Sequence, residues 1–343
     1  MNDMSADTML SYLYGLPEQF ASSLEMKFDF VDRYRKNYNS IVVSGMGGSA
    51  IGGDILRTMA LEQSTVPVIV NRDYTIPHFV NRSTLFIAIS YSGNTEETIS
   101  AYHQARSQGA DIICLTSGGK LQEMAAQDGF AVIKVPGDLV PRAATGFLLA
   151  PVVMFLEDIG IFSTGRKALQ ETVTVLQQQR QRLQPESSIA ENQAKAVALK
   201  LKGAIPIIWG VSGFSEAAAL RWKAQINENS KCPAYYNVFP ELNHNEIVGF
   251  EVPEEILKKL VIILLRDDND HPQVKKRMDI TCSIIKDKVN DIIEIHSQGE
   301  SMLARFYSLT YPGDYASTYL ALEYGINPTP VKVIDYLKKQ LAL

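Results

Sequence analysis

The chain has 343 residues, of which 46% are hydrophobic, and its formal net charge is −5. This length accommodates two domains of typical size, and the mild acidity argues against a nucleic-acid-binding surface. No apolar run reaches membrane-spanning length, and the N-terminus lacks the basic and apolar regions of a signal peptide. Cys114, Cys232 and Cys282 are scattered without CxxC spacing, which predicts reduced thiols in a cytoplasmic protein and neither a disulfide framework nor a zinc site.

Strand-like and helix-like segments alternate through the first half of the chain. The expected strands are apolar and rich in β-branched residues, and they cover residues 40–45, 66–71, 84–90, 111–117 and 130–136. Helical patterns follow two of them, and one of these helices has Thr95 at or near its N-cap and Gly109 at its end. Strands that alternate with helices predict an α/β fold with a mostly parallel sheet.

A polar segment separates this half from a second alternating half. Residues 166–200 are rich in Gln and Arg with spaced apolar positions, which predicts a linking helix. Strand, glycine turn and helix then return at residues 204–230, and further strands are expected within 258–267 and 289–299. The expected domains are an N-terminal domain over residues 1–160, a helical linker over 161–200 and a C-terminal domain over 201–343.

The two halves share a pattern that suggests an internal repeat of a whole domain. "IVVSGMGGSAIGGDILR" (41–57) and "IPIIWGVSGFSEAAALR" (205–221) are both an apolar strand, a glycine-containing turn and a helix. The next strand of each half runs into a different loop, "SYSGNTEET" (90–98) in the first and "RDDNDHP" (266–272) in the second. One loop carries hydroxyls and the other carboxylates, so only the first half is expected to bind an anion.

Hydroxyl and glycine residues gather where two strands of the first half end. A phosphate monoester needs several converging donors, and hydroxyls, backbone N–H groups and a helix N-terminus supply them. Ligands of open α/β sheets bind at the carboxyl ends of the strands. The candidate phosphate-binding residues are Gly47, Gly48, Ser49, Ser90, Ser92 and Thr95.

A dinucleotide site is the alternative interpretation of the first glycine turn. "GMGGSA" fits GxGxxA, and Asp73 ends the following strand, somewhat later than the ribose-binding acid usually comes. This interpretation gives no role to the serine-rich loop, so we rank it below a phosphosugar site. A Walker loop is excluded because no GxxxxGK[ST] motif occurs.

Five segments together resemble a known family. They are "GMGGSAIGGD" (45–54), "SYSGNTEET" (90–98), "VPRAATGFLLAP" (140–151), "INENSKCPAYYNVFPELNHNEIVGFE" (226–251) and "PTPVKVIDYLKKQL" (328–341). In this order, over nearly the whole chain, they resemble the bifunctional phosphoglucose/phosphomannose isomerases of the phosphoglucose isomerase superfamily. The resemblance implies two sugar isomerase (SIS) domains, each a mostly parallel sheet flanked by helices in a flavodoxin-like α/β/α sandwich.

The resemblance also implies an activity and its catalytic residues. The activity is an aldose–ketose isomerisation that interconverts glucose 6-phosphate, and mannose 6-phosphate, with fructose 6-phosphate through an enediolate, without metal or other cofactor. Glu228 matches the base that moves the proton, and Arg142 the cation that stabilises the enediolate. His244 matches the ring-opening histidine, and Lys338, or its neighbour Lys339, the lysine that closes the sugar site.

The implied partners are a sugar-phosphate substrate and a second copy of the chain. In related enzymes the histidine comes from the neighbouring subunit, so a homodimer is expected in which His244 completes the partner's active site. Glu246 is expected to support His244 because it lies close in sequence. The alternatives are an isomerase of another phosphosugar and a non-catalytic sugar-phosphate-binding SIS protein. The joint presence of Glu228, His244 and Arg142 argues against the latter.

Overall fold

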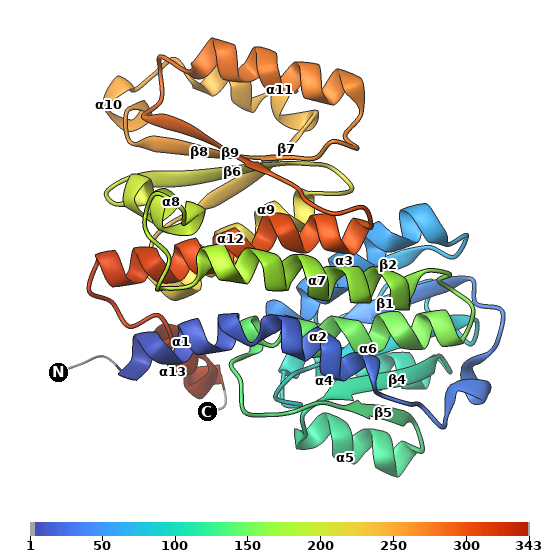
Figure 1. Ribbon diagram of the computed structural model, residues 1–343. Helices are drawn as coiled ribbons and strands as arrows, with labels where there is room; N and C mark the ends of the chain where they lie inside the picture. Colours follow the sequence, from blue (N-terminus) through green and yellow to red (C-terminus); the bar gives the residue numbers. More distant parts are fainter. Residues whose placement is uncertain (1–3, 342–343) are drawn as a thin grey trace. The chain divides into compact units, whose positions relative to one another are not determined.

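The computed structural model describes residues 4–341 of the chain (Figure 1). By their internal contacts the residues divide into two compact units, which we call the N-terminal and the C-terminal unit. The N-terminal unit comprises Gly15–Gln177 and Gly299–Arg305, and the C-terminal unit comprises Met1–Tyr14, Gln178–Gln298 and Phe306–Leu343. The boundaries near residues 160 and 200 that the sequence suggests stay a prediction about where independent domains end.

A five-stranded parallel sheet in the order β2-β1-β3-β4-β5 forms the centre of the N-terminal unit. Its strands are β1 (Ser40–Ser44), β2 (Val68–Asn71), β3 (Thr84–Ile89), β4 (Asp111–Thr116) and β5 (Ala131–Lys134). Every residue of β1 and β3 is buried, as expected for central strands covered by helices on both faces. The order is the flavodoxin-like one, so the predicted α/β class is confirmed for this unit.

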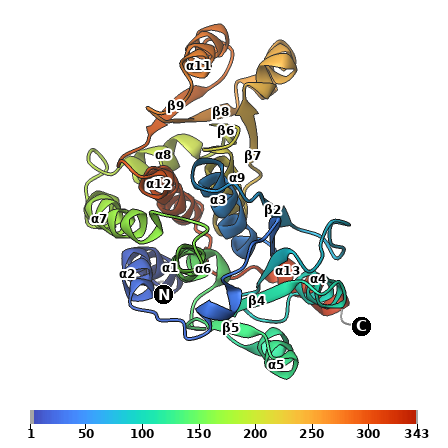
Figure 2. The same ribbon diagram turned by 90° about the vertical axis from the view of Figure 1, so that its right-hand side faces the viewer.

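Helices cover both faces of this sheet because the chain adds its strands in two directions. From β1 it goes to β2 at one edge, and then to β3, β4 and β5 on the other side of β1. Crossovers between parallel strands are right-handed, so α3, which leads toward β2, lies on one face, and α4 and α5, which lead toward β5, lie on the other. In Figure 2, α3 and α6 lie across the sheet from α4 and α5. The helices are α2 (Leu16–Leu24), α3 (Gly48–Gln63), α4 (Glu96–Ser107), α5 (Gly119–Asp128), α6 (Thr145–Asp158) and α7 (Gly165–Leu183), the last of which extends into the C-terminal unit.

A four-stranded parallel sheet in the order β7-β6-β8-β9 forms the centre of the C-terminal unit. Its strands are β6 (Ile205–Val211), β7 (Tyr235–Phe239), β8 (Leu260–Arg266) and β9 (Asp291–His296). This order matches β2-β1-β3-β4 of the first sheet strand for strand, so the predicted internal repeat is confirmed at the level of topology.

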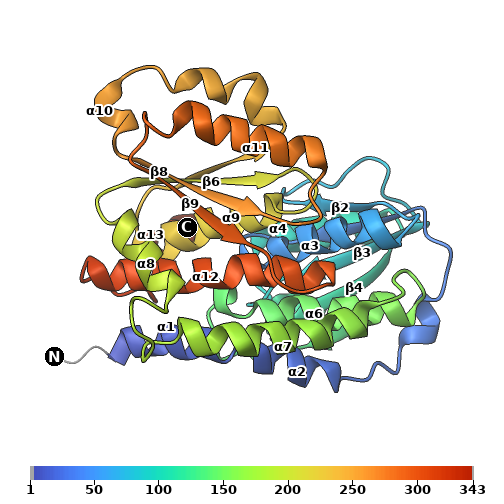
Figure 3. The same ribbon diagram turned by 45° about the horizontal axis from the view of Figure 1, so that its top comes forward.

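The helices of the C-terminal unit also lie on both faces of its sheet. Figures 1 and 3 show α11 on one face and α9 and α12 on the other. The helices are α1 (Met4–Tyr14), α8 (Gln193–Leu201), α9 (Glu216–Gln225), α10 (Glu254–Leu257), α11 (Pro272–Ile285), α12 (Met302–Glu323) and α13 (Lys332–Leu341). None of the helices formed by residues 4–341 combines the length and apolar character that a membrane crossing requires.

Two elements differ from the sequence-based expectation. The polar segment 166–200 forms two helices, α7 and α8, because the chain turns after Leu183 and Asn192 caps the second helix by accepting a hydrogen bond from the Lys195 N–H at 3.1 Å. Strand β7 was not predicted. Its first residues, Tyr235 and Tyr236, are exposed at the edge of the sheet, so the strand lacks the apolar run that marks the buried ones.

The core of the C-terminal unit is built around two buried tryptophans. Trp209 of β6 packs edge-to-face against Phe239 and Phe250, with ring centroids 5.8 and 5.7 Å apart. Trp222 of α9 donates its indole N–H to the carbonyl of Leu309 in α12 at 2.8 Å. Gly313 of α12 lies directly against the face of this indole, since a Cβ built there would overlap with the ring carbons. The glycine therefore sets how closely α12 approaches α9.

We expect Gly313→Ala to lower the thermal unfolding midpoint, although alanine favours a helix more than glycine does. The propensity gain is about 1 kcal/mol. Overpacking a buried core costs roughly 1–3 kcal/mol, and the overlap with the indole of Trp222 is deep enough to place this substitution at the upper end. We therefore expect a net loss of about 2 kcal/mol in the free energy of unfolding.

The matched control is Gly52→Ala in α3, where the added Cβ would meet the Leu148 carbonyl oxygen at an ordinary 3.6 Å. Circular dichroism melts of both variants provide the measurement. A Gly313→Ala protein as stable as the wild type would show that the packing of α12 on α9 tolerates a methyl group and that Gly313 does not set their separation.

Candidate active site

The two loops predicted to hold a phosphate lie at the same edge of the N-terminal sheet. β1 and β3 are adjacent and parallel, with Ser44 beside Ala88, so their carboxyl ends meet. A Cβ built on Gly45 would come within 2.9 Å of the Ile89 carbonyl oxygen, so the loops are in contact. The structure therefore brings the glycine turn and the hydroxyl loop together.

The glycine turn opens helix α3 and touches the turn that carries Arg142. Gly47 is the N-cap residue of α3, and Ser49 in its first turn is buried. A Cβ on Gly48 would lie 2.9 Å from the Pro141 carbonyl oxygen and 3.3 Å from the Arg142 Cα, so only a hydrogen atom fits there. The Arg142 backbone is thus held beside the N-terminus of α3.

The hydroxyl loop brings two of its three predicted donors together. The Ser90 and Thr95 side-chain oxygens are 2.8 Å apart, and the Thr95 N–H donates to Ser90 Oγ at 3.4 Å. Thr95 is the N-cap residue of α4, as the sequence predicts. Ser92 is exposed, and its Oγ accepts a hydrogen bond from the Asn94 N–H at 3.3 Å. Ser90 and Thr95 therefore form the converging pair, while Ser92 lies at the surface of the loop.

The shape of the hydroxyl loop depends on a glycine. Gly93 has φ +69°, a conformation that side chains with a Cβ rarely adopt. A Cβ there would also overlap with the Gly118 carbonyl group of the following loop. Gly93 thus lets the hydroxyl loop pack on its neighbour and fixes where Ser90 and Thr95 lie.

Arg142 is 5% exposed and follows Pro141 in a short 3₁₀ turn, Pro141–Ala143. Gln19 of α2 holds the chain that follows this turn, donating to the Ala143 carbonyl at 2.8 Å and accepting from the Gly146 N–H at 3.2 Å. Gln19 is itself buried. Sequence reasoning missed this supporting residue, because nothing local distinguishes it from other glutamines on an amphipathic helix.

Glu228 lies in a π turn that continues α9. The turn, Ile226–Ser230, has wider helical geometry than α9, and such turns are frequent at functional sites. Glu228 is half-buried and lines a cavity of about 580 Å³ within the C-terminal unit. The other lining residues are Asn227, Lys231, Ile326, Asn327, Pro330, Val331, Lys332, Val333 and Ile334. The cavity thus brings Glu228 beside a largely apolar wall to which the segment 326–334 contributes most of the residues.

A buried polar network fixes α9 and its π turn on α12. Arg221 and Gln225 both bind the carboxylate of Asp314, at 2.8 and 2.9 Å. Asn229 of the π turn donates to Ser317 Oγ at 2.9 Å. Burial raises the pKa of Asp314, and the Arg221 guanidinium opposes this effect. The residue after Glu228 is therefore anchored in the interior.

His244 lies on the surface of the C-terminal unit at the end of the 3₁₀ turn Glu241–His244. Its neighbour Asn243 donates to Thr281 Oγ1 of α11 at 2.8 Å. Glu246, expected to support the histidine, instead accepts hydrogen bonds from the Trp209 indole at 2.8 Å and from the Asn237 amide. Over residues 4–341 no hydrogen bond or ion pair joins Glu246 directly to His244, so a supporting role for Glu246 through the backbone of this segment stays a prediction.

Lys338 and Lys339 are both exposed on α13, whose first turn lines the Glu228 cavity. Lys338 follows Ile334 by one helical turn, so it continues the helix face to which this cavity residue belongs. Lys339 continues the face of Asp335. Lys339 also follows the cavity residue Lys332 by two helical turns, so the choice of Lys338 over Lys339 stays a prediction.

The loop after β8, which corresponds to the hydroxyl loop, carries carboxylates in contact with its own backbone. Asp270 accepts a hydrogen bond from the Asp267 N–H at 3.1 Å, and Asp267 accepts one from Ser297 Oγ at 3.0 Å. Both aspartates are buried. Negative charge in this position disfavours a bound phosphate.

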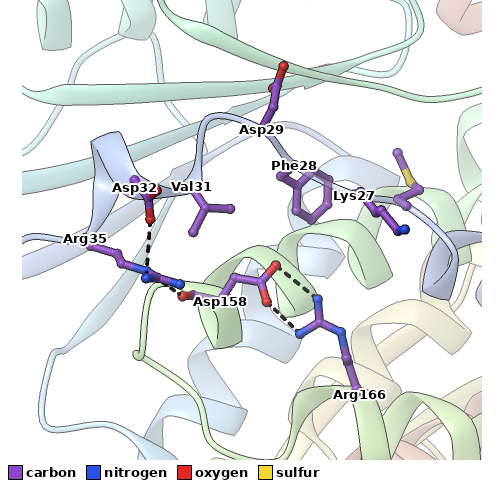
Figure 4. A pocket seen from close by; sticks show the side chains of 9 residues that line it. Lys27, Phe28, Asp29, Val31, Asp32, Arg35, Asp158 and Arg166 are labelled. Carbon is purple, nitrogen blue, oxygen red and sulfur yellow. Dashed lines mark hydrogen bonds and ion pairs between the residues drawn. The ribbon is translucent and has the colours of Figure 1, made fainter.

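Another cavity, of about 340 Å³, lies in the N-terminal unit near α6 and α7 (Figure 4). Arg166 there pairs with Asp158 at 2.8 Å, and Arg35 pairs with Asp32 at 3.3 Å. The cavity contains none of the predicted site residues, and both of these arginines are already paired with acids. Among the described residues no group of three His, Cys, Asp or Glu side chains could hold a metal ion.

Comparisons with known proteins bear on the family and the fold of the chain. Residues 190–341 match the bacterial phospho-glucose isomerase C-terminal SIS domain, and residues 36–143 match the SIS domain. A bifunctional phosphoglucose/phosphomannose isomerase from Caldicellulosiruptor bescii is 50% identical over 97% of this chain and 99% of its own length. A bifunctional phosphoglucose/phosphomannose isomerase from Aquifex aeolicus is 39% identical over 89% of this chain and 91% of its own length.

A solved structure shows the same fold. The C-terminal domain of glucosamine-fructose-6-phosphate aminotransferase from Francisella tularensis superimposes with a TM-score of 0.71 at 13% identity and covers 94% of this chain and 98% of that one. The expected pair of SIS domains is thereby confirmed. With half of its residues identical to a bifunctional phosphoglucose/phosphomannose isomerase over almost its full length, the chain belongs to that family.

Proposed function

We propose that the chain interconverts glucose 6-phosphate and mannose 6-phosphate with fructose 6-phosphate through an enediolate. The observation that carries the proposal is the Ser90–Thr95 hydroxyl pair at the carboxyl edge of a flavodoxin-like sheet, in a member of this family. A phosphate bound there places its negative charge at the N-terminus of α4 and beside that of α3. The Gly47–Ser49 turn and the Ser92 hydroxyl complete the proposed phosphate site.

The proposed chemistry assigns one step to each remaining residue. Moving a proton between C1 and C2 requires a carboxylate base, and we assign this step to Glu228, which lines a cavity. The enediolate carries developing negative charge, and we assign the stabilisation of this charge to the buried Arg142 guanidinium. We assign ring opening to His244 and closure of the sugar site to Lys338. A base and a fixed cation suffice for proton transfer, so no metal or other cofactor is part of the proposal.

The active form is proposed to be a homodimer in which His244 completes the partner's site. Two features support this. The His244 side chain is exposed, and the segment that follows it exposes Val248 and Val252 by 67% and 79%. An exposed apolar segment next to a catalytic histidine is typical of a surface that meets another subunit.

The cytoplasm is the proposed location. Cys114, Cys232 and Cys282 are free thiols, the state that the reducing cytoplasm maintains. The proposed substrates are also intermediates of central carbohydrate metabolism.

We expect the purified protein to convert fructose 6-phosphate to both glucose 6-phosphate and mannose 6-phosphate in the presence of EDTA. Glu228→Gln should lower kcat by about 10²–10⁴-fold, because the amide cannot accept the proton. The variant should still bind the sugar phosphate, since its phosphate donors are intact. A coupled assay that reads each product separately provides the measurement.

The matched control is Glu255→Gln, an exposed acid of α10 in the same unit. It should leave the rate unchanged. Formation of glucose 6-phosphate alone would reduce the proposal to a single-specificity isomerase. If the folded protein forms neither product, the search turns to another phosphosugar or to a binding function.

Removing the hydroxyl pair should weaken substrate binding more than catalysis. The double substitution Ser90→Ala and Thr95→Ala removes two donors, and hydrogen bonds to charged groups contribute about 1.5–3 kcal/mol each, so KM should rise at least about 100-fold. The control is Ser40→Ala with Thr84→Ala. These residues begin β1 and β3, far from the carboxyl ends of the strands, and their buried hydroxyls lie 3.1 Å apart. Steady-state kinetics distinguish the two, and an unchanged KM in the first variant would remove the phosphate from this loop.

Mixing two inactive variants should restore activity if the dimer shares its sites. A dimer of one Glu228→Gln and one His244→Ala subunit has one site with both residues intact. Random pairing makes half of the dimers mixed, so the rate should return to about a quarter of the wild type after subunit exchange. Kinetics after co-refolding, with each variant alone as control, test this. No recovery from mixtures that contain the mixed dimer would mean that His244 acts within its own subunit.

A further inference from the structure

Lys231 ends the π turn in an unusual backbone conformation. Its φ and ψ are 57° and 23°, and among the described residues it is the only non-glycine with a positive φ. A glycine or an asparagine ordinarily occupies such a position because a Cβ disfavours it. Strained backbone of this kind concentrates at functional sites, which directs attention to what the Lys231 side chain does.

The Lys231 ammonium group bridges two carbonyl groups that are distant in sequence. It donates to the Glu228 carbonyl at 2.5 Å and to the Pro328 carbonyl at 2.9 Å. The first carbonyl lies at the C-terminal end of a helix, where carbonyl groups lack helical partners and a cation is favourable. The second lies in the segment that precedes α13.

These two carbonyls belong to the two segments that line the Glu228 cavity, the π turn and residues 326–334. The π turn supplies one wall with Asn227 and Glu228, and residues 326–334 supply the other. Lys231 lines the same cavity, and Pro328 is buried within the second wall. The ammonium group therefore ties the backbone of the base to the segment that supplies the second wall.

We propose that Lys231 is a positioning residue that sets the separation between the Glu228 carboxylate and the wall formed by residues 326–334. The proposal rests on the proposed function, since it assumes that Glu228 is the base. A displacement of about 1 Å at a reacting group can cost up to 10²-fold in rate, so a bridge that fixes both walls bears directly on turnover. The same bridge fixes the start of the segment that continues into α13 and Lys338.

The test compares three substitutions that separate the ammonium group from the backbone strain. Lys231→Met removes the ammonium and keeps a Cβ, so kcat should fall about 10–100-fold with less than a threefold change in KM. Lys231→Gly removes the ammonium and relieves the strain, and it should be as slow as the methionine variant. Lys231→Arg retains N–H donors and should recover at least a third of the wild-type kcat.

A second readout does not depend on isomerase activity. Hydrogen–deuterium exchange should be faster in peptides covering residues 326–334 of Lys231→Met and Lys231→Gly than in the wild type. The control is Lys258→Met, which also removes a lysine–carbonyl bond, 2.6 Å long, to Asp287 of the same unit. It should change neither the kinetics nor the exchange of residues 326–334.

The outcomes separate the two proposals. If the wild type does not isomerise sugar phosphates, the proposed function fails, whereas faster exchange in residues 326–334 would still support the bridge. If Lys231→Met is slow and Lys231→Gly is as fast as the wild type, backbone strain and not the ammonium group is responsible, and the proposal is overturned. It is also overturned if both variants keep at least half of the wild-type kcat, or if exchange of residues 326–334 is unchanged.

Discussion

The buried pair of Arg221 and Asp314 is the interaction on which the candidate active site depends most. Asp314 is fully enclosed in α12, and its carboxylate is compensated by Arg221 at 2.8 Å and by the amide of Gln225 at 2.9 Å. Removing one partner of a buried pair costs about 3–5 kcal/mol, because the other charge is left in the interior. The pair therefore fixes α9 on α12 along one face, and it also fixes where the π turn that directly follows α9 begins. A base in a turn beside a cavity needs this support, and within the cavity the Lys231 ammonium group adds a bond to its backbone carbonyl.

The two repeated sheets show how one topology supports different chemistry. The loops after β3 and β8 follow equivalent strands, yet one ends in the hydroxyl pair Ser90 and Thr95 and the other in the buried acids Asp267 and Asp270. In the first, an external anion is favoured by the donors. In the second, the Asp270 carboxylate already accepts a hydrogen bond from a backbone N–H of its own loop. This internal anion thus occupies a donor of the kind that we propose binds phosphate in the first loop. The repeat thus keeps its fold, while our proposal confines anion binding to one half.

The sequence predicted what local patterns determine and missed what distant residues determine. The apolar strands, the N-cap at Thr95 and the repeat follow from residues close together in the chain, and the structure confirms them. The edge strand β7 was missed because its exposed tyrosines give no apolar run. Gln19 and Asp314 were missed because their partners are distant in sequence. Gln19 binds Ala143, 124 residues away, and Asp314 binds Arg221, 93 residues away, so no local spacing relates them. The family motifs supply the types and order of the candidate site residues, which stay a prediction, whereas the π turn around Glu228 comes from packing that only the structure contains.

The placement of His244 follows from the way its segment is held. Asn243 is tied to Thr281, and Glu246 is tied to Trp209 and Asn237, so the residues on both sides of His244 are fixed to the body of the C-terminal unit. His244 itself faces solvent. The hydrogen bonds of its neighbours hold the backbone of this exposed turn in place, and a ring-opening acid or base must lie within hydrogen-bond distance of the sugar. Our proposal that His244 opens the sugar ring therefore calls for another surface that brings the substrate to it. The exposed valines that follow it give such a surface an apolar area on which to pack, and this is the physical reason for proposing a second copy of the chain there.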